Sequence, residues 1–507
     1  MVEAPQLNGR RVIYSPIEEV NAGNIIEVLE KAMPVHLKNA QEERYLFNRY
    51  RGITPIRGKT KETRKSINHR VREAREVQIV DFWSGTMAGD PIIYTMSRES
   101  TKSTDDLVKL NRYMRLAGKP SADKRLFDWM HITGHGYMMV KHNDNFDEDE
   151  APFDIYVLNP FNTFVVYNAN VGNRRLLGAV YFIDEDRNEI MTCYTPTERF
   201  VIVNRREIRS ISTNGYGIIP IFEFRLNEAC MGAFEPAVDL IDAAEYLDSD
   251  RMDSVTSFVN SLIVLYNARL PDGETSETVR DNGLICLSST GDVKSDIKIL
   301  SEQLDQTSSQ TLKDDIYASI LQICAVPNMG TGNTSDSSNN GAQFLKAGYQ
   351  ITEIRAKSEE NQYKYFANEQ TKLIVKICRE IAGLDINASD IDITFTRHVY
   401  SDIQSKAMVF STLVGTNYVN PLDAWNISGL VNDPEAAYER GMEFRESVRE
   451  EAAKQAEAQS AMNIGGESGS GETIEGNTEE TANAGTGEQK EQHGGMTYIR
   501  GYWTNRK

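Results

Sequence analysis

Two long stretches near the middle of the chain carry apolar residues at helical spacing. The first runs from Glu235 to Asn267, opens with Pro236 at a favourable first helical position and contains no further Pro or Gly. The second runs from Gly341 to Ala382, would be roughly 60 Å long and is followed by Gly383 as a helix stop. Their apolar faces are formed by Leu240, Ala244, Leu247, Val255, Phe258 and Leu262, and by Phe344, Ile351, Ile354, Phe366, Leu373, Ile377 and Ile381.

A small insert, a further helix and a polar loop lie between these two stretches. Residues 270–300 contain short apolar runs typical of strands, and a helix is predicted from Gln303 to Ala325. Two helices that flank a small β insert should form a stalk with a tip. The loop from Pro327 to Asn340, PNMGTGNTSDSSNN, cannot bury enough apolar surface to fold alone. A polar loop on rigid supports usually contacts something.

Alternating apolar residues dominate the first 235 residues. Helical patterns at 71–83, 105–116 and 123–132 precede strands that are rich in Val, Ile, Tyr and Phe, with turn residues between them. The pattern predicts an antiparallel or mixed sheet in an α+β domain. A loose arm with one short helix, Val20–Ala32, comes before it, and Glu42–Tyr50 has an aromatic helical face. The strands are expected at 92–96, 137–142, 153–160, 163–168, 176–183, 189–195 and 199–204.

The C-terminal part is predicted to be helical and then disordered. A strand at 390–397 precedes helices at about 401–414, 421–427 and 434–454. From about Glu457 the sequence consists mainly of Gly, Glu, Asn, Thr and Ser, which is typical of a disordered acidic tail. The last residues, MTYIRGYWTNRK, are basic and aromatic, and either a flexible end or a partner-binding peptide fits them.

Charge changes this picture in two places. The chain has 507 residues with 55 Lys and Arg against 74 Asp and Glu, and its net charge of -19 argues against an ordinary electrostatic grip on nucleic acid. Residues 44–75 form a basic island with eleven Lys or Arg against two Glu. This island fits a solvated face, a contact with a neighbouring subunit or a nucleic-acid contact. The first half of the 235–267 helix holds seven carboxylates, which either line a channel or face solvent: Glu235, Asp239, Asp242, Glu245, Asp248, Asp250 and Asp253.

No motif predicts catalysis, a cofactor, a metal or a membrane span. The Gly58-Lys59-Thr60 triplet lacks the first Gly and the preceding strand of a phosphate-binding loop. The spacing of His131 and His135 suits zinc, but glycines interrupt the helix there, so structural histidines are expected. The acidic turn 143–152 lacks the spacing of a calcium loop. The five cysteines are far apart and predict buried, reduced thiols, and no run of 18 apolar residues occurs.

Four local motifs resemble the portal proteins of tailed bacteriophages, in particular those of long-tailed phages of Gram-positive bacteria. RYRGITPI is similar to the family's Tyr-x-Gly-x-x-x-Ile opening, and NHRVREAREVQIVDFWSGTMAGDPIIY to its Asn…Ile-Val-Asp…Gly-x-Pro passage. GYGIIPIFEFRLN is similar to the segment before the family's stem, and DITFTRHVYSD to the strand that enters its crown. Together with the helix, insert, helix, loop and long-helix order, they cover most of residues 40–450.

The resemblance implies the portal fold and its division into parts. These would be an N-terminal arm (1–40), an α+β wing (41–235), stem helices (236–267 and 301–326), a clip (268–300), a tunnel loop (327–340), a long wing helix (341–383), a crown (384–456) and the tail (457–507). It also implies a ring, typically of twelve subunits, at the portal vertex of the capsid in the virion, assembled in the host cytoplasm. Double-stranded DNA would pass through the ring. The implied partners are the large terminase subunit, a head-completion adaptor, and the major capsid and scaffolding proteins, with no membrane and no enzymatic activity.

Candidate site residues follow from the resemblance and the charge pattern. A minor capsid or scaffolding protein that never encircles DNA is the alternative function. The candidate residues are Asn328, Thr331, Asn333, Thr334, Ser335, Asp336, Ser337, Ser338, Asn339 and Asn340 in the tunnel loop, Asp239, Asp242, Glu245, Asp250 and Asp253 in the acidic stem lining, and Asp272, Glu274, Glu277, Arg280, Asp292 and Lys294 for partner docking on the clip.

Overall fold

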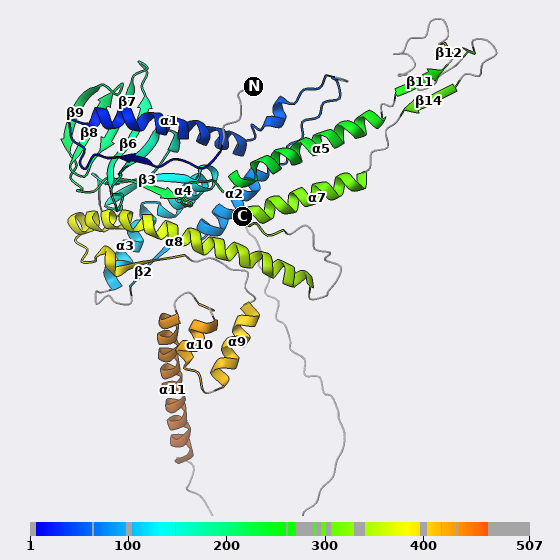
Figure 1. Ribbon diagram of the computed structural model, residues 1–507. Helices are drawn as coiled ribbons and strands as arrows, with labels where there is room; N and C mark the ends of the chain where they lie inside the picture. Colours follow the sequence, from blue (N-terminus) through cyan, green and yellow to red (C-terminus); the bar gives the residue numbers. More distant parts are fainter. Residues whose placement is uncertain are drawn as a thin grey trace, which may run out of the picture. The chain divides into compact units, whose positions relative to one another are not determined.

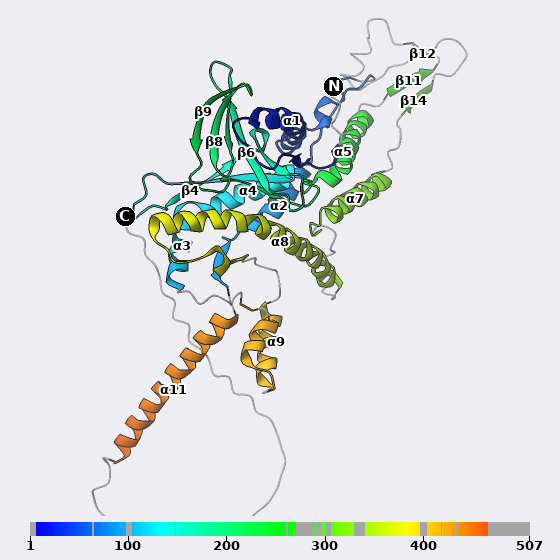
Figure 2. The same ribbon diagram turned by 60° about the vertical axis from the view of Figure 1, so that its left-hand side comes forward.

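The computed structural model divides into two compact units, Met1–Asp402 and Ile403–Lys507. Figures 1 and 2 show the chain in two views related by a 60° turn. The residues that the structure describes are 7–62, 65–97, 104–147, 149–259, 262–266, 268–269, 288–289, 296–300, 306–328, 340–395, 403–416, 418–428, 430–431 and 434–464.

A six-stranded sheet forms one part of the first unit, and its strands follow the order β1-β5-β6-β7-β8-β9. β1 is parallel to β5, with Ile13 opposite Val166, and the other neighbours are antiparallel, so the prediction of a mixed sheet is confirmed. Strands β1 and β9 were not predicted from the sequence. The strands are β1 (Ile13–Ser15), β5 (Thr163–Asn168), β6 (Arg175–Ile183), β7 (Glu189–Tyr194), β8 (Glu198–Val203) and β9 (Glu207–Thr213).

Helix α1 (Ile25–Tyr50) covers one face of this sheet (Figure 1). Its Val28, Leu29 and Met33 are buried in one cluster with sheet residues such as Phe164. The prediction of two separate helical segments here is wrong, because α1 continues through Pro34. Burial of a continuous apolar face outweighs the backbone hydrogen bond that a proline removes.

The described start of the chain is packed against the fold and is not a loose arm. Arg10 is buried and its Nη2 lies 2.7 Å from Oε1 of Glu235, while its Nε lies 3.2 Å from Oε2 of Glu42. Gly9 has φ +76°, and a Cβ there would lie 1.9 Å from the carbonyl oxygen of Ala229. Only glycine fits this position, so the segment is locked to the residues just before the acidic helix.

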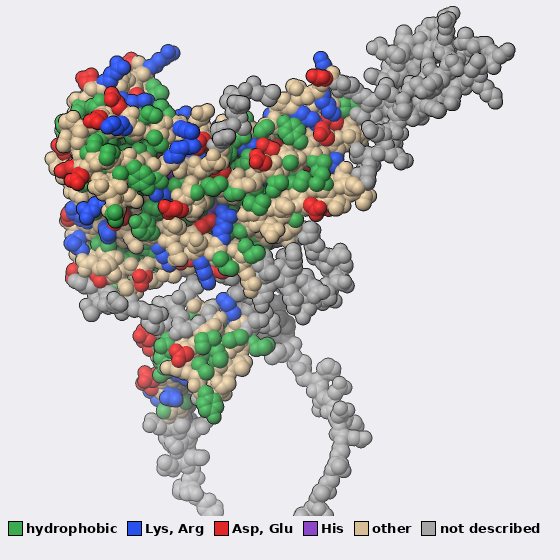
Figure 3. Space-filling model, viewed as in Figure 1, with side chains coloured by type: hydrophobic (Ala, Val, Ile, Leu, Met, Phe, Trp, Pro, Cys, Tyr) green, Lys and Arg blue, Asp and Glu red, His purple; other side chains and the backbone are tan. Residues whose placement is uncertain are grey.

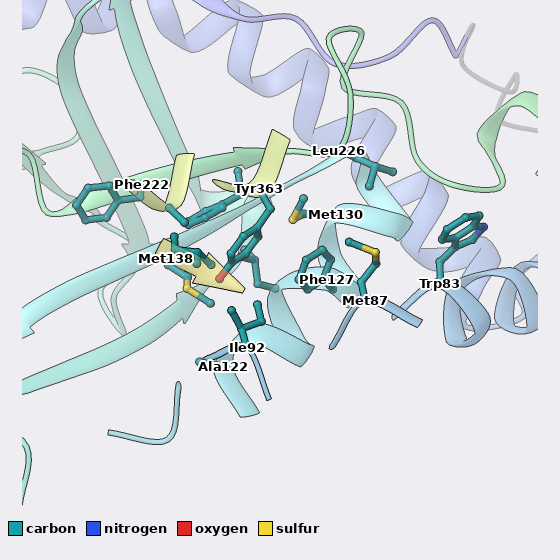
Figure 4. Close-up of a cluster of buried hydrophobic side chains, with 14 of the residues drawn as sticks. Trp83, Met87, Ile92, Ala122, Phe127, Met130, Met138, Phe222, Leu226 and Tyr363 are labelled. Carbon is teal, nitrogen blue, oxygen red and sulfur yellow. The ribbon is translucent and has the colours of Figure 1, made fainter. Parts of the chain in front are cut away.

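A second layer joins a three-stranded antiparallel sheet, in the order β10-β3-β4, to helices from both halves of the first unit. The largest cluster of buried apolar residues lies here, and Figure 4 shows Trp83, Phe127, Tyr363 and Phe222 within it. Phe127 stacks on Tyr363 with ring centroids 5.2 Å apart. The elements are η1 (Pro55–Gly58), α2 (Arg75–Ala88), β2 (Ile93–Met96), α3 (Thr104–Leu116), α4 (Lys119–Thr133), β3 (His135–His142), β4 (Phe153–Leu158), η2 (Pro160–Asn162) and β10 (Ile221–Arg225).

The predicted stalk is present, with a different boundary. A short turn η3 (Glu235–Ala237) leads into α5 (Val238–Val259), and the second helix is α7 (Gln306–Ile323). The helix predicted to reach Asn267 ends at Val259, because Leu262–Tyr266 forms strand β11 instead. This run of Leu, Ile, Val and Tyr favours a strand when a partner is available. β11 pairs with β14 (Asp296–Leu300), and β12 (Ala268–Arg269) with β13 (Ser288–Ser289), so a β insert follows α5 as predicted.

The long helix α8 (Asn340–Ala382) confirms the prediction for 341–382, and Gly383 follows with φ +66°. After η4 (Ala388–Asp390), β15 (Ile391–Thr394) pairs antiparallel with β2, which lies almost 300 residues earlier.

The second unit contains α9 (Ile403–Gly415), α10 (Pro421–Ser428) and α11 (Pro434–Ile464). Phe410 and Trp425 pack together with ring centroids 4.1 Å apart. The predicted start of the disordered tail at Glu457 is wrong, because α11 continues to Ile464. Residues 450–462 are rich in Glu, Ala, Lys and Gln, which are strong helix formers and also mimic a disordered composition.

Candidate functional site: the acidic stem helix and the loop supports

Helix α5 carries the acidic residues singled out from the sequence, and the structure shows the partner of most of them. At its start, Glu235 is buried and accepts hydrogen bonds from the backbone N–H groups of Gly9 and Gly232 and from Arg10. Glu235 therefore ties the turn before α5 to the N-terminal segment and contributes no free surface charge.

The next acidic residue that faces the wing is held by Arg49. Its guanidinium lies 2.7 and 3.1 Å from the two carboxylate oxygens of Asp242 and 3.0 Å from Glu76. Arg49 and Glu76 are fully buried, and the Asp242 side chain is 24% exposed. Two parallel N–H···O bonds fix both distance and orientation. Arg49, from the basic island, thus pairs inside the protein with one carboxylate of the acidic helix, that of Asp242.

One turn further, Glu245 is fully buried against the basic island. Its Oε2 accepts a hydrogen bond from the Thr54 hydroxyl at 2.8 Å. Burial raises the pKa of Glu245, and the nearby carboxylate of Glu76 adds to this, whereas the Thr54 hydrogen bond opposes it. In the structure of the single subunit, the carboxyl group of Glu245 is buried and therefore cannot face a channel.

Asp253 is the most heavily bonded acidic residue of α5. Its side chain is 2% exposed and contacts Nζ of Lys59 at 2.8 Å and Nζ of Lys61 at 2.6 Å. It also accepts the backbone N–H of His69 at 2.7 Å, and His69 Nδ1 lies 2.8 Å away. Burial alone would raise the pKa of Asp253, but the His69 N–H and the two lysines outweigh it and hold the pKa well below its ordinary value.

The opposite side of α5 is tied to α7. Nζ of Lys313 lies 2.6 Å from Asp248 and 2.8 Å from Glu73, and Nη1 of Arg251 donates to Gln310 at 3.1 Å. Lys313 of α7 therefore joins α5 to Glu73, two residues before α2. These bonds fix the two helices to each other and to the segment that precedes α2.

Only two of the five candidate lining residues remain exposed, namely Asp239 and Asp250. The Asp250 side chain is 61% exposed and also lies 2.8 Å from Lys59. The expectation of a wall of seven free carboxylates is therefore corrected. On the face shown in Figure 3, the acidic side chains along α5 and α7 are scattered among hydrophobic and uncharged ones.

The residues that support the polar loop are fastened to one another. The carbonyl oxygen of Cys324, just after α7, accepts hydrogen bonds from Nε1 of Trp83 and Nη1 of Arg355, each at 2.9 Å. The next carbonyl, of Ala325, accepts the Thr352 hydroxyl at 2.9 Å. The end of α7 is thus anchored about one third of the way along α8.

The remaining candidate residues lie outside the described part of the chain. For the loop, the structure describes Asn328 and the backbone of Asn340 but none of Thr331, Asn333, Thr334, Ser335, Asp336, Ser337, Ser338 and Asn339. All six clip candidates also lie outside the described residues: Asp272, Glu274, Glu277, Arg280, Asp292 and Lys294.

The two histidines considered as zinc ligands contact separate sets of carboxylates. Nε2 of His131 lies 3.2 Å from Glu359, and His135 lies between Glu43 at 2.7 Å and Glu223 at 3.2 Å. Within the described ranges, no three His, Cys, Asp or Glu side chains are placed to hold a metal ion. Cys193, Cys230, Cys324 and Cys378 are buried and not in disulfides, as predicted, whereas Cys286 lies outside the described residues.

Among the residues that the structure describes, no helix combines the length and the low polarity that crossing a bilayer requires.

Comparisons with known proteins give one strong and several distant similarities. A family profile described as "Phage portal protein, SPP1 Gp6-like" matches residues 33–465. No curated protein matches the chain. Three solved structures cover 70% of this chain and 90% of their own chains: the neck of an empty GTA particle with C6 symmetry (12% identity, TM-score 0.43), the neck of a native GTA particle with C12 symmetry (13%, 0.40) and the virion of a native gene transfer agent particle (11%, 0.40). These structural similarities are too distant to say how this chain assembles.

Proposed function

The chain belongs to the SPP1 Gp6-like family of phage portal proteins, and we propose that it forms a ring at the portal vertex of the capsid that conducts double-stranded DNA during packaging and ejection. The observation that carries this proposal is the family match over residues 33–465, which includes the wing, both stem helices and the long helix. By the resemblance, the ring has typically twelve subunits.

The stalk is the element best suited to dock other proteins. α5 and α7 lead to the β11–β14 ladder, away from the six-stranded sheet (Figure 1). We assign the large terminase subunit and the head-completion adaptor to the insert between these strands, with Asp272, Glu274, Glu277, Arg280, Asp292 and Lys294 as contact candidates. The major capsid and scaffolding proteins would contact the rest of the ring.

The channel surface of the stem would be only moderately acidic. Asp239, Tyr246 and Asp250 form an exposed stripe on α5 at helical spacing, whereas Glu245 and Asp253 are buried and Asp242 is partly buried. We place this stripe toward the channel. Two carboxylates per subunit, repeated around a ring, still disfavour tight adhesion of phosphates.

The polar loop would form a collar around the DNA. The segment just before the loop is anchored to α8, because the Ala325 carbonyl oxygen accepts the hydroxyl of Thr352, twelve residues into that helix. The loop contains no Lys or Arg and a single acidic residue, Asp336, so it would contact DNA through hydrogen bonds and steric fit.

Deletion of Ser335–Asn339 tests the loop. The supports at Trp83, Thr352 and Arg355 are untouched, so the ring should assemble normally while DNA packaging or retention falls. The measurement is the amount of nuclease-protected DNA per particle. Unchanged packaging would remove the loop from the mechanism.

Negative-stain electron microscopy of the purified protein tests the ring itself. Annular particles with a central hole are expected. Monomers or irregular aggregates at every concentration would favour the alternative of a minor capsid or scaffolding protein. Hydrolysis of ATP by the pure protein would contradict a purely structural role.

A further inference from the structure

Three aromatic rings and three arginines lie together on the surface of the first unit, where α1, α4 and η2 meet. Phe47 stacks on Trp129 with ring centroids 5.0 Å apart, and Phe161 packs edge-on at 5.7 Å from Phe47 and 5.4 Å from Trp129. All three side chains are only partly buried. These residues come from positions far apart in the sequence, and the sequence pattern did not group them.

A hollow of about 240 Å³ opens beside these rings. Buried Ile132 and partly buried Val157 supply its aliphatic lining. The other lining residues are Phe47, Tyr50, Arg125, Asp128 and Trp129. The hollow is smaller than typical small-molecule sites of about 300–1,000 Å³. Its size and lining suit a single apolar side chain.

The surrounding arginines are exposed and not neutralised. The Arg44 guanidinium lies 5.5 Å from the Phe161 ring centroid and that of Arg51 lies 5.7 Å from Phe47. In the part of the chain that the structure describes, neither these two nor Arg125 forms an ion pair with a carboxylate. By contrast, nearby basic side chains of the same island, such as Arg49 and Lys59, are paired with α5.

Two acidic groups lie near the hollow. Asp128 lies 2.6 Å from Nζ of Lys124, which balances its charge, whereas Asp81 accepts a hydrogen bond at 3.3 Å from the uncharged Tyr50 hydroxyl. Among the described residues, three arginines against the one carboxylate without a basic partner leave an excess of positive charge here, on a chain whose net charge is -19.

We propose that this surface, formed by Arg44, Phe47, Arg51, Arg125, Trp129 and Phe161, docks an acidic peptide segment of a partner protein. One apolar side chain of the peptide enters the hollow, and flanking carboxylates pair with the arginines. Trp and Arg are the residues that most often dominate binding energy at interfaces. Arginine also binds carboxylates through two parallel hydrogen bonds.

The ring arrangement favours a peptide over nucleic acid. Base stacking needs an accessible aromatic face. The Phe47 ring, however, already stacks on Trp129 and lies under the Arg51 guanidinium, and the Phe161 ring lies under that of Arg44. An aliphatic hollow also fits an apolar side chain better than a nucleobase. This inference goes beyond the portal assignment, because the surface requires neither a ring nor DNA in the channel.

The proposal is tested by fluorescence anisotropy with a short labelled peptide of glutamates around one leucine, added to the full chain. The variant Arg44→Ala/Arg51→Ala/Arg125→Ala should weaken binding roughly tenfold or more, since each exposed ion pair contributes up to about fivefold. The control Arg115→Ala/Arg206→Ala/Arg209→Ala removes the same charge from exposed sites elsewhere in the unit and should leave affinity unchanged. A peptide with serine in place of leucine should also bind weakly.

Four results would overturn the proposal. The first is equal loss in the two triple variants, and the second is equal binding of the serine peptide. The third is binding of labelled oligothymidylate in preference to the acidic peptide. The fourth is loss of self-association in the arginine variant together with no peptide binding to the unaltered protein, which would make the surface an interface between copies. A shift in Trp129 fluorescence that disappears in Trp129→Phe would locate a bound peptide directly.

Discussion

Replacement of Asp253 by Asn should loosen the basic segment from the stem helix. The Asp253 carboxylate is 2% exposed and accepts contacts from Lys59, Lys61 and two nitrogens of His69, all between 2.6 and 2.8 Å. Breaking a fully buried ion pair costs about 3–5 kcal/mol. Lys61 and His69 are about one third exposed, and Lys59 retains its ion pair with Asp250. We therefore expect Asp253→Asn to lower the local stability by about 2 kcal/mol.

Hydrogen exchange followed by mass spectrometry measures this local effect. A loss of about 2 kcal/mol corresponds to roughly thirtyfold faster exchange in peptides from residues 54–62 and 245–256. Global unfolding is a poorer measure, because a chain of two units need not unfold in a single transition.

The matched control is Asp250→Asn, three residues earlier on the same helix. Its side chain is 61% exposed and shares Lys59, so exchange should rise less than about fivefold. Equal exchange in the two variants would refute the reasoning that burial, rather than acidic charge alone, makes Asp253 important. Because the pKa of Asp253 is lowered in the folded protein, its stabilising effect should be present above pH about 4 and fall away as the pH drops below that.

Two further predictions concern buried polar contacts. Burial alone would lower the pKa of His135, but hydrogen bonds to Glu223 and Glu43 raise it to about 9. The stability that it contributes should therefore be complete below pH about 6.5 and be lost as the pH rises through about 9. The difference in protection from hydrogen exchange around residue 135 between the unaltered protein and His135→Asn should shrink over that interval, and a constant difference would contradict this. Trp83→Phe removes the indole donor to the Cys324 carbonyl oxygen and should destabilise the anchor after α7 by about 1 kcal/mol, seen as faster exchange at residues 324–328, whereas exchange in β5–β8 should not change.

Local elements could be predicted from the sequence wherever a single pattern decided the outcome. Helix α8 has apolar residues at helical spacing over its length and a glycine directly after it, so its bounds differ by one residue from those expected. Strand β1 was missed because three residues hold too little pattern, and its parallel pairing with β5 depends on a contact across 150 residues. Helix propensity in residues 457–464 was hidden by an acidic, low-complexity composition.

The candidate site could be predicted in composition but not in arrangement. The acidic helix and the basic island were both recognised, yet the sequence does not show that Arg49, Lys59 and Lys61 reach Asp242 and Asp253 across nearly two hundred residues. Pairing of this kind depends on tertiary packing, which places α5 against residues 49–69. It turns a predicted repulsive wall into a fixed joint between α5 and residues 49–69.

Electron cryomicroscopy of DNA-filled particles tests the central claim most directly. A ring of this protein should lie at one capsid vertex, enclose duplex DNA on its axis and present residues 335–339 as the protein closest to the DNA, with the stripe of Asp239 and Asp250 facing the channel. Density for this chain away from the DNA path, or at many capsid positions rather than one vertex, would contradict the proposed function.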